Sequence, residues 1–378
     1  MINNIYKKLL CWFIVGAVFS SCSTVEEQEG GVKAFELDKV KLLEGPFKHA
    51  VDLNIELLLQ YEPDRLLSKF RSEAGLEPKG EHYGGWEKES LAGHTLGHHL
   101  SACALMYLTS GDLRFYDRAQ YIVNELSAIQ DADGEGYLGA FPKGKKIFEE
   151  EVAKGVIRAQ SFDLNGIWAP FYTHHKVMAG LRDSYRLLGI EKALNVESKF
   201  ADWIGTVVNP LNDGQLQLML NCEHGGMNEV LVDLYTDTKE QKYLDMSYRF
   251  HHKVVLDSLA NHNDILPGIH GNTQIPKLIG LAKRYDVTHN EKDYEAATFF
   301  WDRVVNHHSY VTGGHGNFEY FGQPDQLTNR LSDGTTETCN VYNMLKLSDL
   351  IFQWKPTAAV ADFYERALFN HILASQHP

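Results

Sequence analysis

Apolar residues recur with the helical period along most of the chain from residue 46 onward. Their three- and four-residue spacing predicts amphipathic helices, which are separated by short turns that contain Gly, Asn or Asp. A strand-like pattern occurs only at residues 35–43, so the sequence predicts an all-α protein. We expect helices near 47–61, 86–109, 113–129, 168–187, 191–209, 224–236, 240–258, 274–287, 291–306, 337–353 and 357–375.

The predicted helices alternate between two kinds, which form a weak internal repeat. One kind begins with a polar cluster and then becomes apolar, as in WAPFYTHHKVMAGL and ETCNVYNMLKL. The other kind opens near a tyrosine, as at Tyr116, Tyr243, Tyr294 and Tyr364. This alternation predicts an (α/α)6 toroid of helical hairpins over residues 46–378. Helices of the first kind would form the inner ring, with their polar starts together at one end.

The number of predicted helices of each kind is uneven. Five helices have the inner pattern and six, with 47–61 included, have the outer pattern. The last predicted outer helix is not followed by an inner one. We therefore expect an incomplete toroid that lacks its last inner helix.

The first residues have the pattern of an export signal. Two lysines precede the apolar run from Leu9 to Phe19, which ends in small residues before Cys22. The run is too short to span a bilayer. We expect a lipoprotein-type signal peptide over 1–22, with Cys22 lipidated, followed by a tether and a lone strand over 23–45. Ordinary secretion is the alternative, and either process places the protein in the periplasm or at the outer membrane or cell surface.

Composition and charge narrow the choice of partners. The chain has 378 residues, of which 44% are hydrophobic, and can bury a large core. Its formal charge of −14 argues against nucleic acid and anionic membranes as partners, because they require a basic surface. We expect a glycan or a small neutral or cationic molecule as partner, and membrane contact only through a lipid anchor.

Few cysteines remain beyond the signal segment. Cys103, Cys222 and Cys339 are an odd and sparse set for an exported protein, which is a poor basis for a disulfide framework. At least one of these thiols therefore cannot be paired in a disulfide within the chain, and burial, metal binding or reactivity would explain its presence.

The stretch from Gly313 to Leu347 concentrates the candidate chemistry. Glu319 lies among Phe318, Tyr320 and Phe321. A carboxyl group in apolar surroundings has a raised pKa, which suits a general acid. Candidates for a second carboxylate are Asp325 and Asp333.

Glu337 and Cys339 lie at the start of a predicted helix. Their side chains would point apart within a helix but can converge in the turn before it. A thiolate at a helix N-terminus is stabilised by the helix dipole and by a cation such as zinc. The alternative is a buried, inert cysteine beside a glutamate of the first helical turn.

Histidines and tryptophans at the polar starts of the inner helices are candidate sugar contacts. His174, His224 and His270 offer hydrogen bonds to hydroxyl groups, and Trp86 and Trp168 offer aromatic faces to a sugar ring. A packing role is the alternative for each histidine.

A further histidine pair shares one face of a predicted helix. His94 and His98 are four residues apart, which allows metal binding, contact with sugar or a structural role. The remaining large aromatic residues are expected to fill the core between helix layers, namely Trp203, Trp301 and Trp354.

Four segments carry a resemblance to a known family over residues 32–378, namely GGWEKESLAGHTLGHHLSACALMYLTSGD, DADGEGYLGA, HGNTQIPK and FEYFGQPDQLTNRLSDGTTETCNVYNMLKL. They resemble the catalytic domain of glycoside hydrolase families 127 and 146, the β-L-arabinofuranosidases. The resemblance implies a retaining hydrolysis in which a zinc-held cysteine is the nucleophile and a glutamic acid protonates the leaving group. It assigns the acid/base role to Glu319, zinc binding to Glu337 and Cys339, and sugar contacts to His174, His224 and His270.

One departure from the family pattern affects the expected activity. The family places its nucleophile and fourth zinc ligand on neighbouring cysteines, and this sequence contains no Cys-Cys pair. We therefore expect an incomplete zinc site, and a chain that is inactive by itself.

Three functions are carried forward from the sequence. The first is a β-L-arabinofuranosidase that acts on arabinose-containing glycans or oligosaccharides of plants. The second is another (α/α)6 carbohydrate enzyme, such as an unsaturated glucuronyl hydrolase or a sugar epimerase. The third is a surface lipoprotein that binds glycans without catalysis.

Overall fold

The computed structural model describes residues 31–88 and 90–377. The predicted signal peptide 1–22, with Cys22, lies outside these residues. Within them the regular secondary structure is almost entirely helical, which confirms the predicted all-α class. None of the described helices is both long enough and apolar enough to cross a membrane.

The helices follow most of the predicted apolar runs. In chain order they are α1 (Pro46–Gln60), α2 (Pro63–Glu73), α3 (His94–Ser110), α4 (Leu113–Asp133), α5 (Gly144–Glu150), α6 (Pro170–Leu188), α7 (Glu191–Val208), α8 (Asp213–Met219), α9 (Met227–Thr238), α10 (Gln241–Arg249), α11 (Lys253–Ala260), α12 (Gly271–Thr288), α13 (Glu291–Arg303), α14 (Thr338–Trp354) and α15 (Ala358–Ala367).

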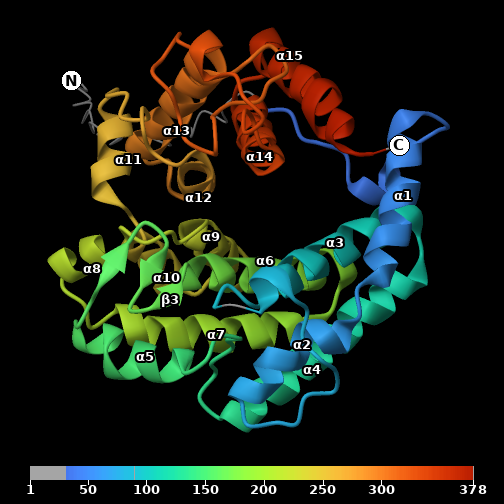
Figure 1. The fold of residues 1–378 in the computed structure, drawn as a ribbon, viewed down its shortest axis with the longest axis vertical. Coiled ribbons are helices and arrows are strands. Elements are labelled where there is room, and N and C mark those ends of the chain that lie inside the picture. Colours follow the sequence, from blue (N-terminus) through green and yellow to red (C-terminus); the bar gives the residue numbers. More distant parts are fainter. Residues whose placement is uncertain (1–30, 89, 378) are drawn as a thin grey trace, which may run out of the picture.

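Helical hairpins follow one another around a ring (Figure 1). The inner helices are α3, α6, α9, α12 and α14, and each packs against the next in this order. Helices α3 and α6 lie in close contact, since a Cβ atom at Gly97 would lie 2.2 Å from the carbonyl of Lys176. The predicted toroid of alternating inner and outer helices is thus confirmed.

The hydrophobic core consists of two clusters. One extends over elements between Leu66 and Phe250, and the other extends between Val255 and Ala367. Helices α9 and α12 pack together where the two halves of the ring meet.

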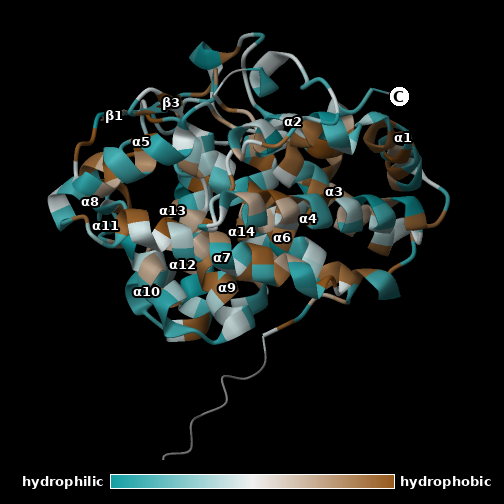
Figure 2. Cartoon of the chain, turned by 90° about the horizontal axis from the view of Figure 1, so that it is seen from below, coloured by the Kyte–Doolittle hydropathy of each residue, from teal (hydrophilic) through white to brown (hydrophobic). Residues whose placement is uncertain are grey.

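A short antiparallel sheet interrupts the helical pattern between α5 and α6. Its strands β1 (Ala159–Gln160), β2 (Asp163–Leu164) and β3 (Ile167–Trp168) pair in the order β1-β2-β3, with Asp163 opposite Trp168. The sheet and several long loops lie along one edge of the ring (Figure 2).

Several predicted elements differ in the structure. The expected strand at 35–43 is wrong: Leu37–Lys39 form a single 3-10 turn, and Phe35 and Leu43 are exposed. The predicted helix 240–258 is two helices, because the chain turns at Phe250 and buries this side chain in the core.

The helix predicted over 86–109 begins only at His94. Before it, Gly85–Glu87 form a 3-10 turn. The Glu87 carboxylate accepts hydrogen bonds from the backbone N–H groups of Gly93 (2.8 Å) and Thr95 (3.1 Å). These bonds satisfy donors that a helix start leaves free.

Candidate active site

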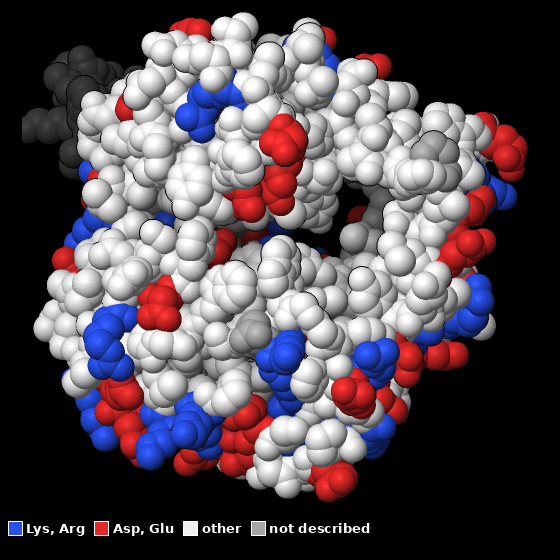
Figure 3. Space-filling model, in the orientation of Figure 1, with Lys and Arg blue, Asp and Glu red and all other residues white. Residues whose placement is uncertain are grey.

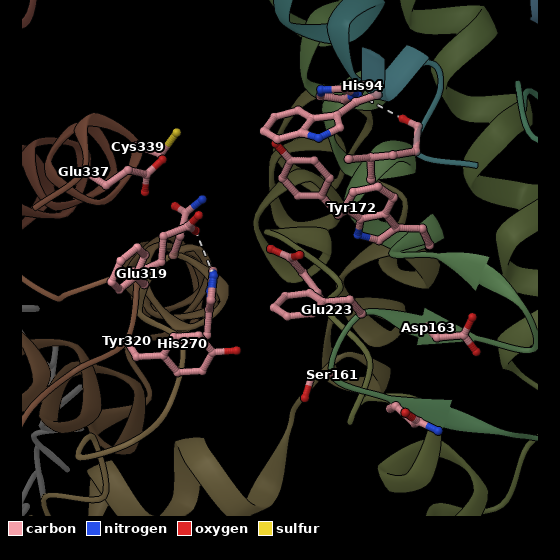
Figure 4. A pocket seen from close by; sticks show the side chains of 17 residues that line it. His94, Ser161, Asp163, Tyr172, Glu223, His270, Glu319, Tyr320, Glu337 and Cys339 are labelled. Carbon is pink, nitrogen blue, oxygen red and sulfur yellow. Dashed lines mark hydrogen bonds and ion pairs between the residues drawn. The ribbon is translucent and has the colours of Figure 1, made fainter. Parts of the chain in front are cut away.

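A cleft of about 740 Å³ opens between the two halves of the ring. Acidic side chains gather at the rim of the central hollow on the face shown in Figure 3. Figure 4 shows two walls that face each other across the cleft. The first wall carries Trp86, His94, Trp168, Tyr172 and Glu223, and the second carries His270, Phe318, Glu319, Tyr320, Glu337 and Cys339.

Glu319 occupies a tight turn in the second wall. Asn317 and Tyr320 exchange two backbone hydrogen bonds (3.0 and 3.2 Å), and both residues between them, Phe318 and Glu319, have positive φ angles of 47° and 68°. A turn with two such angles normally takes Asn-Gly. Left-handed backbone at other residues is strained and is characteristic of functional sites. The turn therefore holds Glu319 at the cleft at a cost in stability.

The chain before α12 holds this turn beside His270. The Gly271 N–H donates to the Glu319 carbonyl (2.6 Å), and His270 and Tyr320 form an antiparallel bridge. The edges of Phe162 and Tyr320 pack against the His270 ring, each at a centroid distance of 5.1 Å. The imidazole is consequently fixed in position.

The hydrogen bonds of His270 determine its tautomer. His270 is the N-cap of α12, and its Nδ1 accepts from the backbone N–H of Thr273 (3.3 Å). The proton of the neutral ring is therefore on Nε2, which lies 2.8 Å from Glu319 Oε2. This hydrogen bond lowers the pKa of the Glu319 carboxyl below its ordinary value.

The predicted raised pKa of Glu319 is therefore wrong. Of its aromatic neighbours, Phe318 and Tyr320 are 67% and 39% exposed and do not enclose the carboxyl group. Phe321 is buried in the core of the second half. The donor on His270 has more influence on the carboxylate than the apolar neighbours do.

Glu337 and Cys339 meet at the start of α14, as the sequence predicts. Glu337 is the N-cap, with extended backbone, and Cys339 is in the first turn. Cys339 is exposed, so the burial that the alternative expects is wrong, whereas Cys103 and Cys222 are buried. Desolvation on the cleft wall, followed by the Glu337 carboxyl beside it, raises the pKa of the Cys339 thiol to about 12. The thiol is thus protonated at neutral pH.

The donors near this thiol make up only part of a zinc site. Glu337 Oε2 is buried without a hydrogen-bond partner, and Cys339 offers sulfur next to it. Among residues 31–88 and 90–377, no group of three or more His, Cys, Asp or Glu side chains is arranged to hold a metal ion. A structural or catalytic zinc site needs at least three protein ligands. The described residues therefore do not complete such a site.

Two of the predicted sugar contacts lie outside the cleft lining. His174 is fully buried, and its ring is surrounded by Phe141, Phe148 and Phe200, with no partner for either nitrogen. His174 therefore has the packing role that was the alternative to sugar contact, because a side chain in the aromatic core cannot reach a ligand in the cleft. His224 is also buried, with Nδ1 3.1 Å from the Cys222 carbonyl.

The other predicted contacts do line the cleft, and the two tryptophans lie together. Trp86 is 63% exposed, and its ring meets that of Trp168 edge-on at a centroid distance of 6.4 Å. Trp203 and Trp301 are buried, as expected. The structure thus brings Trp86, Trp168 and His270 together with the candidate catalytic residues.

His94, for which the sequence left metal binding, sugar contact and a structural role open, lines the cleft, as do Glu223, beside His224, and Tyr172, which the sequence did not single out. Each lies at or near the polar start of an inner helix, so the pattern contained the signal, but it did not show which residues face the ligand. His94 Nδ1 lies 2.9 Å from the Leu91 carbonyl and 3.1 Å from Glu87. This contact fixes the orientation of the His94 ring.

The candidates for a second carboxylate are not in the cleft lining. Asp325 is exposed and interacts with His307 at 3.1 Å. Asp333 is also exposed.

Toroid-type glycoside hydrolases have the same ring of paired helices. The chain belongs to the family described as beta-L-arabinofuranosidase, GH127 catalytic domain, whose model matches residues 39–378. No curated protein sequence matches the chain significantly.

Solved structures show the same fold at low sequence identity. A GH127 beta-L-arabinofuranosidase from Geobacillus stearothermophilus T6 is 20% identical, with a TM-score of 0.66, over 88% of this chain and 55% of that one. A second GH127 beta-arabinofuranosidase is 19% identical, with a TM-score of 0.65, over 90% of this chain and 54% of that one. The chain thus spans about half the length of these two proteins.

Proposed function

We propose that the protein is a glycoside hydrolase that acts on arabinofuranosyl groups of neutral glycans. The observation that carries the proposal is Glu319, held on a strained turn and facing an aromatic wall across a cleft large enough for a sugar. Membership of the GH127 family supports the same reaction class.

Glu319 is the proposed acid and base. When protonated, its carboxyl group donates a proton to the oxygen of the leaving group, and afterwards it takes a proton from the attacking water. In the ligand-free cleft His270 favours the ionised form. Covering the half-exposed carboxyl with a sugar would raise its pKa, because desolvation disfavours the charge.

Charge in the cleft favours a neutral substrate over a uronic acid. Among the described residues, the lining contains Asp163, Glu223, Glu319 and Glu337 but neither lysine nor arginine. Recognition of a sugar carboxylate normally relies on a cationic partner. This composition disfavours the alternative of an unsaturated glucuronyl hydrolase.

Zinc and export are further parts of the proposal. The unpaired Glu337 oxygen beside the Cys339 thiol supports their role as one side of a zinc site. Zinc would lower the pKa of a bound thiol. No cleft residue is assigned as the nucleophile, since the sequence contains no Cys-Cys pair. The signal pattern before Cys22 supports a lipid-anchored protein outside the cytoplasm.

Turnover of a chromogenic β-L-arabinofuranoside tests the function. If the chain hydrolyses this substrate, we expect Glu319→Gln to reduce kcat by about 10²- to 10⁴-fold while the sugar still binds, since the amide cannot transfer a proton. Calorimetry with methyl β-L-arabinofuranoside measures binding separately. Binding without turnover by the wild-type chain would agree with the incomplete zinc site as well as with the glycan-binding alternative, and absence of both would contradict the proposed substrate.

A further inference from the structure

Glu223 lies in the cleft wall opposite Glu319 (Figure 4). Only 9% of the residue is exposed, yet its carboxyl group meets no hydrogen-bond donor among the described residues. Its oxygens are not among the fully enclosed side-chain atoms that lack a partner, so they are open to the cleft. A carboxyl group held in this way at a cleft surface can accept a hydrogen bond from a bound ligand.

The backbone around Glu223 is fixed on both sides. The Glu223 N–H donates to the Ser161 carbonyl at 2.8 Å, which ties the loop to the segment between β1 and β2. Two residues beyond it, Gly225 has a φ of 53°, and a Cβ atom there would lie 2.7 Å from His175 Nδ1. The same nitrogen accepts from the Gly226 N–H at 3.1 Å. The loop thus fixes the backbone from which the carboxyl group reaches the cleft.

The charges around Glu223 do not replace a hydrogen bond. His270 is the strongest of the charges that attract it, followed by Lys176 and Lys277, whereas Glu319 repels it from the opposite wall. Burial is the largest influence and raises the pKa of Glu223. The carboxyl group has no direct partner among the described residues, and a hydroxyl group of a ligand can supply one: it can donate to the ionised carboxylate, and it can donate to or accept from the protonated carboxyl group.

We propose that Glu223 is a specificity-determining residue, which binds one or two hydroxyl groups of the sugar whose glycosidic bond faces Glu319. This inference rests on the proposed function and names the ligand more closely. The preferred sugar is neutral and has free hydroxyl groups on the ring edge that faces Glu223. A sugar that lacks the hydroxyl, or carries an ester or ether on it, leaves the carboxyl group unpaired and binds less tightly.

Binding of deoxy sugars to the full chain tests the assignment. The probes are methyl β-L-arabinofuranoside and its 2-deoxy and 3-deoxy analogues, measured by calorimetry. We expect the wild type to bind one deoxy analogue about 10- to 100-fold more weakly than the parent sugar, which is the effect of losing a hydrogen bond to a charged group. Glu223→Ala should weaken binding of the parent by a similar factor and should bind that analogue and the parent equally.

Two further variants separate this role from damage to the fold. Glu223→Gln keeps the size of the side chain and one acceptor oxygen, so it should retain part of the discrimination. Glu150→Gln removes a charge from the exposed surface of α5 and should discriminate like the wild type. Circular dichroism checks that each variant is folded.

The outcomes distinguish the two proposals. If the wild type discriminates between the sugars and Glu223→Ala does so equally well, the assignment of Glu223 is overturned and the proposed function stands. If the wild type binds none of the arabinofuranosides, the proposed function fails and the assignment fails with it.

Discussion

Glu319 combines a chemical role with an unfavourable backbone position. Its φ of 68°, next to 47° at Phe318, lies in the left-handed region that costs about 1–2 kcal/mol for residues other than glycine. We predict that Glu319→Gly is about 1 kcal/mol more stable than Glu319→Gln and abolishes any turnover, because both variants lose the ionised contact with His270 but only glycine adopts this backbone without strain. Urea unfolding measures the difference. Equal stability of the two variants would contradict the role of strain.

The hydrogen bond from His270 makes the ionisation of Glu319 depend on one neighbour. Since the folded pKa of Glu319 is lower than its ordinary value of 4.5, its contribution to stability is present above pH 4.5. That contribution is lost as the pH falls through the folded value. We predict that His270→Asn, which keeps an acceptor for the Thr273 N–H, raises the pKa of Glu319 towards 4.5.

Titration of the Glu319 carboxyl carbon by NMR measures this pKa directly. The stability difference between the wild type and His270→Asn should shrink as the pH falls below the ordinary value. His289→Asn, outside the cleft at the end of α12, serves as the control and should leave the titration unchanged. An unchanged Glu319 pKa in His270→Asn would show that another group sets it.

Individual site residues were predictable where a motif fixed both residue type and position. Glu319, Glu337 and Cys339 share one segment and meet in the cleft. His174 was the wrong choice within a pair, because neighbouring helical positions differ by about 100° and the sequence does not show which of them faces the core. The neighbouring His175 instead holds the loop before α9 through the Gly226 N–H.

Among the elements, long amphipathic helices were predictable and breaks without Gly or Pro were not. The 11-residue α2 and the seven-residue α5 and α8 were missed. The break between α10 and α11 has no sequence marker, since the segment between them is Phe250-His251-His252 and burial of Phe250 determines the turn. Tertiary packing thus overrode a continuous helical pattern.

The start of α3 depends on a glutamate outside the helix. Desolvation opposes ionisation of Glu87, but hydrogen bonds from His94, Thr95 and Gly93 lower its pKa overall. We predict that Glu87→Ala destabilises the fold by about 0.5–2 kcal/mol, as expected for loss of a helix cap. Urea unfolding measures the loss, and Glu87→Gln, which retains an acceptor oxygen, should lose less.

Sugar binding in the cleft provides a second test of the role of Glu87 at the start of α3. Glu87 holds His94, and Trp86 immediately precedes it on the first wall. If the loss of Glu87 displaces Trp86 and His94 on the first wall, Glu87→Ala should bind the sugar more weakly than Glu87→Gln. If both variants match the wild type in stability, the cap does not determine where α3 begins.

At the scale of the whole molecule, the active cleft lies between two cores. One wall is built on elements of the first cluster and the other on elements of the second. The contact between α9 and α12 aligns the two walls. Asn228 Nδ2 on α9 donates to the Lys277 carbonyl on α12 at 2.8 Å. A Cβ atom at Gly280 would lie 2.2 Å from the Asn228 side chain, so the two helices pack closely. The order of helices around the ring was predictable from the alternating pattern. The division of the core into two clusters was not, because it depends on tertiary packing, which the periodicity of the sequence does not show.

The opposite side of the ring is held much more loosely. No residue of α1 is buried, and a cavity of about 620 Å³ separates this helix from the segment after α15. The contacts across it include an edge-on pair of Phe47 and Phe369 at 4.9 Å and a hydrogen bond from Gln376 to the Ala50 carbonyl at 3.1 Å. Segments with few buried contacts open locally at low free energy.

We therefore predict that amide hydrogens of α1 exchange much faster than those of α6, whose inner face is buried. Phe369→Ala should accelerate exchange in α1 further, because the aromatic pair contributes about 0.5–1.5 kcal/mol, and should leave α6 unchanged. Hydrogen exchange followed by mass spectrometry measures both helices in one experiment. Phe363→Ala, at a fully buried position, is the control and should cost about 3–5 kcal/mol throughout the second half. Equal protection of α1 and α6 would show that the ring is cooperative on both sides.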